Sequence, residues 1–177
     1  TLGLTFEELT YDRAVMALAS TPPYHNHIGG PHAGAMFTLA ESASGALIFA
    51  NFGDIPEVVT PLAVEATIRY LKVAMGTVTA TATMPTSRDE IMATLSEGRR
   101  PEFTIEVELS TGLGDERVVT GVMSVLWTLT ALAPIAMASA RLRSPKTSRI
   151  RSMLLSSESR FRFVQADSGI SSRRNSG

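Results

Sequence analysis

One carboxylate, Glu41, stands alone in a long uncharged stretch of the sequence. Across residues 14–53, forty positions, it is the only side chain other than histidine with a formal charge at neutral pH. An ionised carboxylate among apolar residues costs free energy unless it is paired or hydrogen-bonded, and its pKa rises if it is not. Beside a cleft, such a group is a candidate general acid, general base or nucleophile. The competing interpretation is that Glu41 faces solvent or a dimer partner and bonds to Ser42, Ser44 or that partner.

A second group of candidate residues lies just upstream, in the segment YHNHIGGPHAG at 24–34. This segment ends where a helix is expected to begin, and free amides at a helix start suit an anion or a carbonyl oxygen that gains negative charge. Ala33 and Gly34 are small and leave that backbone open to a ligand. Glu41 lies about two and a half turns further on. We therefore expect the amides and the carboxylate to meet across a subunit interface, with Glu41 activating a water or attacking directly.

The element that carries these groups is a helix predicted over residues 31–51. Its apolar residues cover nearly the whole circumference, which is typical of a buried helix rather than one laid on a surface. Pro31 after two glycines suits the first turn, and Gly53 suits the end.

Four later segments alternate apolar and polar residues with the period of a half-buried strand. Their apolar sets are Leu62, Val64, Ala66, Ile68 and Tyr70; Val78, Ala80, Ala82 and Met84; Phe103, Ile105, Val107 and Leu109; and Val119, Gly121, Met123, Val125, Trp127 and Leu129. Residues 12–19 are expected to form a first strand, 112–116 a hairpin link, and 87–95 a short helix opened by a capping box. One polar face on each strand favours antiparallel pairing. The sequence thus predicts an α+β fold, an antiparallel sheet wrapped round one long central helix.

At these residues the sequence resembles the hotdog-fold thioesterases, specifically the PaaI-like branch and its DUF4442 relatives. The family pattern is Asn, a short spacer with Gly, His-Gly-Gly at the start of the central helix, and an acid nine positions after that His. Asn26, His32, Gly34 and Glu41 stand at the matching places, and the likeness covers about residues 5–130. The sequence departs from the pattern at Ala33, which adds a methyl group where the substrate carbonyl should approach.

The resemblance implies a function for each matching residue. The helix-start amides at Gly34 and its neighbours would polarise a thioester carbonyl, Glu41 would act as general base or nucleophile, and Asn26 or His32 would position carbonyl or water. It also implies a homodimer or a dimer of dimers, with coenzyme A docked at a subunit interface as part of the substrate and no separate cofactor.

Charge divides the chain into two parts. Residues 1–130, the predicted hotdog domain, have a net charge of −8, whereas residues 131–177 have +7 and include 11 Ser. Such a tail composition is typical of a disordered extension. Its basic residues would be able to contact an anionic membrane surface or nucleic acid, whereas no nucleic-acid binding is expected of the core.

Other classes of site are disfavoured. The chain has no Cys, which excludes disulfides, Cys-based metal sites and cysteine nucleophiles. No acid lies between Arg13 and Glu41 to complete a metal site with His25, His27 or His32, so no metal is expected. Arginines at 88, 99 and 100 would be able to touch coenzyme A phosphates, although solvated loop positions are the simpler interpretation.

Two hypotheses on function follow. The first is an acyl-CoA thioesterase that hydrolyses a small or medium acyl-CoA; the second is a non-catalytic hotdog module that binds acyl thioesters or serves as an assembly scaffold. The uncharged residues 118–140 are long enough to cross a bilayer. However, the alternation over 119–129 and the Pro at 134 favour a soluble protein, and no signal peptide is visible, so a cytoplasmic location is expected.

Overall fold

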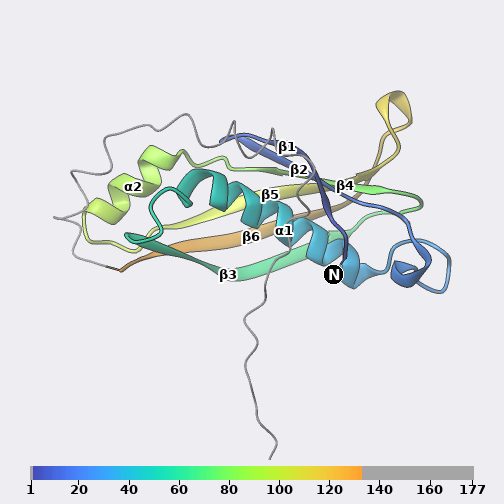
Figure 1. The fold of residues 1–177 in the computed structure, drawn as a ribbon, viewed down its shortest axis with the longest axis horizontal. Coiled ribbons are helices and arrows are strands. Elements are labelled where there is room, and N and C mark those ends of the chain that lie inside the picture. Colours follow the sequence, from blue (N-terminus) through green and yellow to red (C-terminus); the bar gives the residue numbers. More distant parts are fainter. Residues whose placement is uncertain (1, 133–177) are drawn as a thin grey trace, which may run out of the picture. The chain divides into compact units, whose positions relative to one another are not determined.

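The computed structural model describes residues 2–132, which form one antiparallel sheet and two helices (Figure 1). The predicted extension at 131–177 lies outside the described residues from position 133 onward. The six strands have the order β1-β2-β4-β5-β6-β3 in the sheet. The elements are β1 (Thr5–Leu9), β2 (Arg13–Leu18), α1 (Ala33–Phe52), β3 (Val59–Tyr70), β4 (Val78–Thr83), α2 (Arg88–Ser96), β5 (Glu102–Thr111) and β6 (Val118–Ala131). This is the predicted arrangement, a sheet wrapped round one long central helix, and it confirms the hotdog fold.

Most strands confirm the alternation read from the sequence. In β4 and β5 the apolar positions are buried against α1, as in Ala80 and Ile105, which are both 0 % exposed. The capping box before α2 is present, since Ser87 Oγ accepts from the Glu90 amide and the Glu90 carboxylate accepts from the Ser87 amide. The hairpin link between β5 and β6 contains a short 3-10 turn, Gly114–Glu116.

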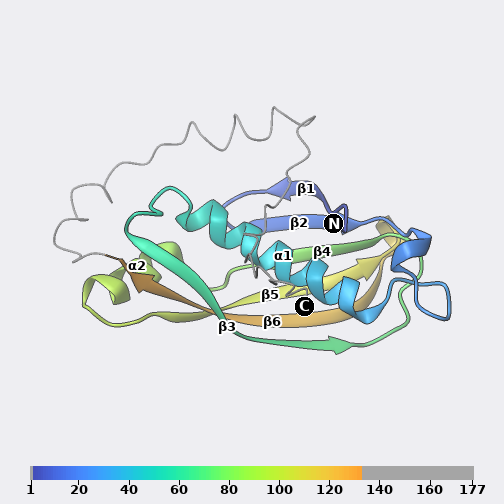
Figure 2. The same cartoon turned by 60° about the horizontal axis from the view of Figure 1, so that its bottom comes forward.

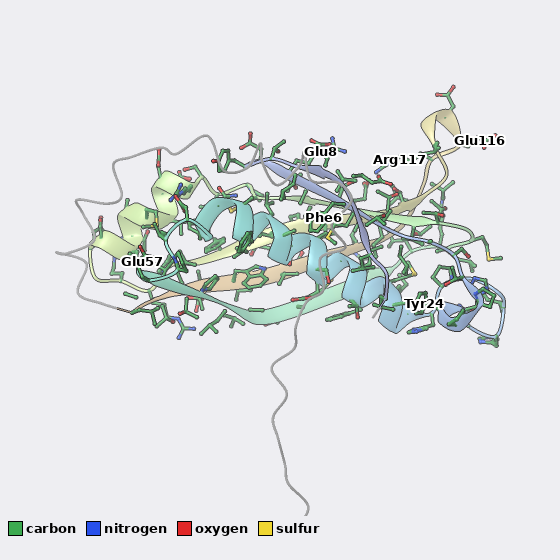
Figure 3. The ribbon with its side chains drawn as sticks, in the orientation of Figure 1. Phe6, Glu8, Tyr24, Glu57, Glu116 and Arg117 are labelled. Carbon is green, nitrogen blue, oxygen red and sulfur yellow. The ribbon has the colours of Figure 1, made fainter. Side chains whose placement is uncertain are left out.

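The N-terminal strand β1 was not predicted. It pairs antiparallel with β2 at the edge of the sheet and contains a register shift between Phe6 and Glu8. Phe6 is 45 % exposed, and both residues lie along the β1 ribbon (Figure 3). A five-residue edge strand with an irregular register shows no period of two, which explains why alternation does not reveal it.

The predicted faces of β3 are wrong in its first half. Ala63 pairs with Trp127, and Val64 is an extra residue in a bulge. Residues opposite one another in a sheet share a face, and Trp127 faces α1, so Ala63 lies on the helix side. Its neighbour Leu62 therefore lies on the outer side of the sheet, where it is 46 % exposed. After the bulge, Ala66 lies on the helix side as predicted. A bulge shifts the period of two by one residue, and a strict alternation cannot anticipate it.

Helix α1 crosses the sheet obliquely and is fixed at both ends (Figure 2). Near its C-terminal end, Asn51 Nδ2 donates to the carbonyl of Tyr11 in the β1–β2 turn at 2.8 Å. At its N-terminal end, the Tyr70 hydroxyl of β3 donates to the Ala33 carbonyl, also at 2.8 Å. The helix therefore spans from the neighbourhood of one sheet edge to the other, and its orientation is fixed by hydrogen bonds as well as by packing.

The helix α1 and the uncharged stretch noted in the sequence at 118–140 are each long and apolar enough to cross a bilayer. Among the described residues one helix, α1, is long and apolar enough by length and composition, and it packs on the sheet with core residues such as Leu39 and Leu47 fully buried. Residues 118–131 of the uncharged stretch at 118–140 form β6, an interior strand of the sheet between β5 and β3. Burial in the protein core thus accounts for the apolar character of both described segments.

Candidate functional site

The loop before α1 is organised by the side chain of Asn26. Its Oδ1 accepts from the amides of Ile28 at 3.0 Å and Gly30 at 3.3 Å, and its Nδ2 donates to the carbonyl of Pro31 at 3.4 Å. Asn26 was predicted to position a substrate carbonyl or a water. The structure places it where it fixes the backbone that leads into the helix, which brings it to the same end of α1 as His32 and Gly34.

A close backbone approach explains why this loop requires Gly30. A Cβ atom built there would lie 2.2 Å from the carbonyl oxygen of Ala74, in the loop after β3. Only glycine permits this approach. This contact between the two loops therefore fixes where the backbone lies as it enters α1.

His32 is the N-cap of α1, which begins at Ala33 rather than at the predicted Pro31. Its Nδ1 accepts from the amide of Ala35 at 3.0 Å. In this bond Nδ1 is the acceptor, so the neutral ring has its proton on Nε2. The imidazole is exposed, so its Nε2–H is available to a ligand at the helix start.

Two free amides mark the beginning of α1. In the part of the chain that the structure describes, the N–H groups of Ala33 and Gly34 donate to no acceptor, and both residues are exposed. They lie at the positive end of the helix dipole. Figure 3 places the labelled Tyr24 beside this end of α1 and Glu57 at the other end. The helix start therefore offers two adjacent donors to a carbonyl oxygen or an oxyanion.

A hydrogen bond from Tyr70 to this helix start was not anticipated. Tyr70 is the last residue of β3, and its hydroxyl reaches the Ala33 carbonyl. Burial raises the pKa of the Tyr70 phenol above its usual value. In the sequence Tyr70 reads only as the last apolar residue of an alternating strand, and no local signal connects it to a helix 37 positions earlier.

Glu41 lies about 10 Å along α1 from Gly34 and on the same side of the helix, because seven residues make almost two full turns. It is half-buried, and desolvation raises the pKa of its carboxyl group. Within residues 2–132 its carboxylate makes no hydrogen bond or ion pair, and Ser44 donates to the main-chain carbonyl of Glu41 at 2.8 Å rather than to its side chain. Within one chain the structure does not bring Glu41 into contact with Asn26 or His32.

The side of α1 that carries Glu41 is open. Its exposed or half-buried residues form one helical stripe, namely Gly34, Thr38, Glu41, Ser42, Gly45 and Phe49. Phe49 is 56 % exposed, which is unusual for the central helix of a sheet-wrapped fold. This stripe requires either solvent or another chain beside it.

Two shallow cavities of about 250 and 230 Å³ lie elsewhere, where α2 meets β5 and the end of β6, and both are lined by Arg99 and Arg100. They are at the opposite end of the sheet from the start of α1 (Figure 1). Arg99 pairs with Glu97, and Arg100 Nε donates to Thr128 Oγ1 at 2.8 Å. Among the described residues no group of three His, Cys, Asp or Glu is placed to hold a metal ion.

The comparisons with known proteins identify the family and agree with the fold. Residues 1–127 match the family described as "Domain of unknown function (DUF4442)", which confirms the resemblance noted in the sequence. No curated protein gives a significant match.

Several solved structures share the fold. A Pseudomonas aeruginosa protein described as of unknown function and a probable thioesterase is 26 % identical, with a TM-score of 0.64 over 73 % of this chain and 84 % of its own. A thioesterase family protein from Silicibacter pomeroyi is 18 % identical, with a TM-score of 0.58 over 73 % and 86 %. A protein of unknown function from Chlorobaculum tepidum is 12 % identical, with a TM-score of 0.63 over 72 % and 82 %. Of these three proteins, the first is described as a probable thioesterase and the second as a thioesterase family protein.

Proposed function

Because the chain belongs to the DUF4442 family, we propose that it is an acyl-CoA thioesterase that hydrolyses a small or medium acyl-CoA. The observation that carries the proposal is the exposed start of α1, where the amides of Ala33 and Gly34 have no acceptor among the described residues. The carboxylate of Glu41 lies on the same open stripe of the helix, and its pKa is raised by desolvation. An oxyanion-type donor pair and a carboxylate of raised pKa are the two components that thioester hydrolysis by water requires.

In the proposed reaction the thioester oxygen accepts hydrogen bonds from the Gly34 and Ala33 amides. A water oxygen attacks the carbonyl carbon, and the proton of that water passes to Glu41. The carbon–sulfur bond then breaks, the coenzyme A thiolate leaves and takes up the proton held by Glu41, and the free acid remains with the Glu41 carboxylate restored. The amides stabilise the charge on the oxygen in the transition state, which is worth about 10²–10³ in rate for one such donor.

The separation of about 10 Å between Gly34 and Glu41 along one helix is too long for both to act on one carbonyl. We therefore propose that Gly34 of one subunit works with Glu41 of its partner in a homodimer. Mixing two inactive variants tests this arrangement. A hybrid dimer of Glu41→Gln and Gly34→Val subunits would retain one intact site if the site is shared, and activity would reappear on mixing. It would contain no intact site if each site belonged to one chain, and mixing would then restore nothing.

The open edge of the sheet supports this dimer. Of the thirteen exposed large hydrophobic residues within 2–132, six lie between positions 62 and 75, on β3 and the loop after it; they are Leu62, Val64, Tyr70, Leu71, Val73 and Met75. The opposite edge, β1, has five residues and includes Glu7 and Glu8, whereas β3 has twelve. Short and charged edges protect against pairing, and long apolar ones promote it. We propose that the β3 edge and the Glu41 stripe both face a second copy of the chain, with no separate cofactor.

The alternative is a non-catalytic hotdog module that binds acyl thioesters or serves as an assembly scaffold. Ala33 favours it, since its methyl group stands at the exposed helix start beside the proposed donors. An acyl-CoA panel separates the two functions. Turnover that depends on Glu41 supports the thioesterase, whereas coenzyme A binding without turnover on any chain length supports the module.

A further inference from the structure

We propose that Tyr70 is a positioning residue whose hydroxyl orients and polarises the peptide unit that supplies the Gly34 amide. This inference rests on the proposed function, because it assigns to Tyr70 an effect on the oxyanion donor of that site. It adds a residue that the family pattern in the sequence does not contain.

The geometry follows from which atoms share a peptide plane. Tyr70 Oη donates to the Ala33 carbonyl oxygen at 2.8 Å. The carbonyl of Ala33 and the N–H of Gly34 are the two polar ends of one planar peptide unit. A hydrogen bond received at the oxygen draws electron density along the conjugated unit and makes the N–H a stronger donor, by about 10–30 % per bond in chains of hydrogen bonds. Tyr70 therefore acts on the Gly34 amide without touching the substrate.

The Ala33 carbonyl can accept this second bond. A carbonyl oxygen has two lone pairs, and the amide four residues later in the helix takes one of them. Tyr70 takes the other, at the first residue of α1, where the helix has fewest bonds to restrain it. The bond thus fixes the direction of the Gly34 N–H at the point where a frayed helix end would leave it variable.

The same bond connects the proposed interface to the proposed donors. Tyr70 is the last residue of the edge strand β3, 37 residues from Ala33 in the sequence. Tyr70 as a residue is 46 % exposed, yet burial raises the pKa of its hydroxyl, so the phenol remains a protonated donor through neutral pH. Pairing of β3 with a second copy would therefore also hold the helix start in place.

Tyr70→Phe tests the inference, with Tyr11→Phe as the matched control. Tyr11 is 42 % exposed, and among the described residues its hydroxyl makes no hydrogen bond. In Tyr70→Phe the kcat for acyl-CoA hydrolysis should fall about 2- to 10-fold with KM unchanged, as expected for one neutral hydrogen bond felt only in the transition state. Tyr11→Phe should match the wild type.

A second readout does not depend on turnover. In ¹H–¹⁵N spectra, Tyr70→Phe should move the Gly34 amide proton upfield, and more than the amide proton of Ala35, which is already bonded to His32. Replacing Tyr70 with 3-fluorotyrosine, which keeps the hydroxyl and makes it a stronger donor, should move the Gly34 proton the opposite way. A Gly34 resonance that is the same in all three proteins would overturn the inference. Absence of wild-type turnover would overturn the proposed function, while the spectra would still decide the role of Tyr70.

Discussion

Trp127 donates its indole N–H to the hydroxyl of Ser44 at 3.3 Å, and this bond fixes the rotation of α1 on the sheet. Ser44 is fully buried and in turn donates to the Glu41 carbonyl. Glu41 lies three residues before Ser44, so its side chain lies only about 60° further round the helix, at the border between the buried side and the open stripe. The bond between Trp127 and Ser44 therefore also fixes the rotational position of the candidate catalytic carboxylate.

Ser44→Ala should lower the free energy of unfolding by about 1–3 kcal/mol, because it leaves the Trp127 N–H buried without an acceptor. Urea titration followed by Trp127 fluorescence measures the change, as Trp127 is the only tryptophan. Ser42→Ala is the matched control, since the half-buried Ser42 hydroxyl makes no hydrogen bond among the described residues. Equal stability of the two variants would show that the indole bond does not hold the helix.

Glu41→Gln should stabilise the protein at neutral pH while it removes activity. Desolvation raises the pKa of Glu41 in the folded chain, so the folded state binds this proton more tightly than the unfolded state. The free energy of unfolding then falls as pH rises from the ordinary pKa to the raised one, and the loss is complete above it. A glutamine side chain does not ionise, so the variant does not lose this free energy of unfolding as pH rises.

Thermal melts at several pH values check this sign. The Tm advantage of Glu41→Gln should be greatest at pH 7–8 and should vanish at pH values below the ordinary carboxyl pKa of about 4.3. Glu7→Gln, the same change on the exposed strand β1, serves as the control and should leave the pH trend of the wild type intact. A wild type more stable than Glu41→Gln at pH 8 would mean that a partner compensates the charge.

Ala33→Gly should raise kcat/KM for acyl-CoA by about 5- to 150-fold, if relief of a methyl clash is worth the 1–3 kcal/mol typical of overpacking. The same change should lower stability by up to about 1 kcal/mol through helix propensity. Ala46→Gly, within the same helix but three turns from its start, should reproduce only the loss of stability. An unchanged kcat/KM would show that the methyl group does not obstruct the carbonyl.

Val64→Lys should convert the proposed dimer into monomers, because a charge at the bulge of β3 opposes edge-to-edge pairing. Light scattering after size-exclusion chromatography gives the mass directly. Leu113→Lys places the same charge on an exposed apolar residue in the β5–β6 turn, away from β3, and should leave the mass unchanged. A wild type that is monomeric at micromolar concentration would contradict the shared site.

Local periodicity determined how much of this fold could be predicted. The regular strands and the central helix follow from it, because Ile105 and its neighbours alternate without interruption and α1 is apolar on nearly every side. The bulge at Val64 and the edge strand β1 do not, because both break the period of two. Register shifts depend on pairing with distant residues, which a local pattern does not contain.

The candidate site was predictable in its parts but not in its connections. Spacing alone placed Gly34 at a helix start and Glu41 on the same helix. The roles of Asn26 in the loop and of His32 as N-cap emerge only from side-chain hydrogen bonds. Tyr70 could not be predicted, since its contact with Ala33 joins segments 37 residues apart.

The most direct test is the steady-state hydrolysis of an acyl-CoA panel by the wild type and by Glu41→Gln. If Glu41 delivers or activates the attacking water, the wild type turns over at least one small or medium acyl-CoA, and Glu41→Gln lowers kcat about 10²–10⁴-fold with little change in KM. Turnover by Glu41→Gln equal to that of the wild type, or none by the wild type at any chain length, would contradict the thioesterase account.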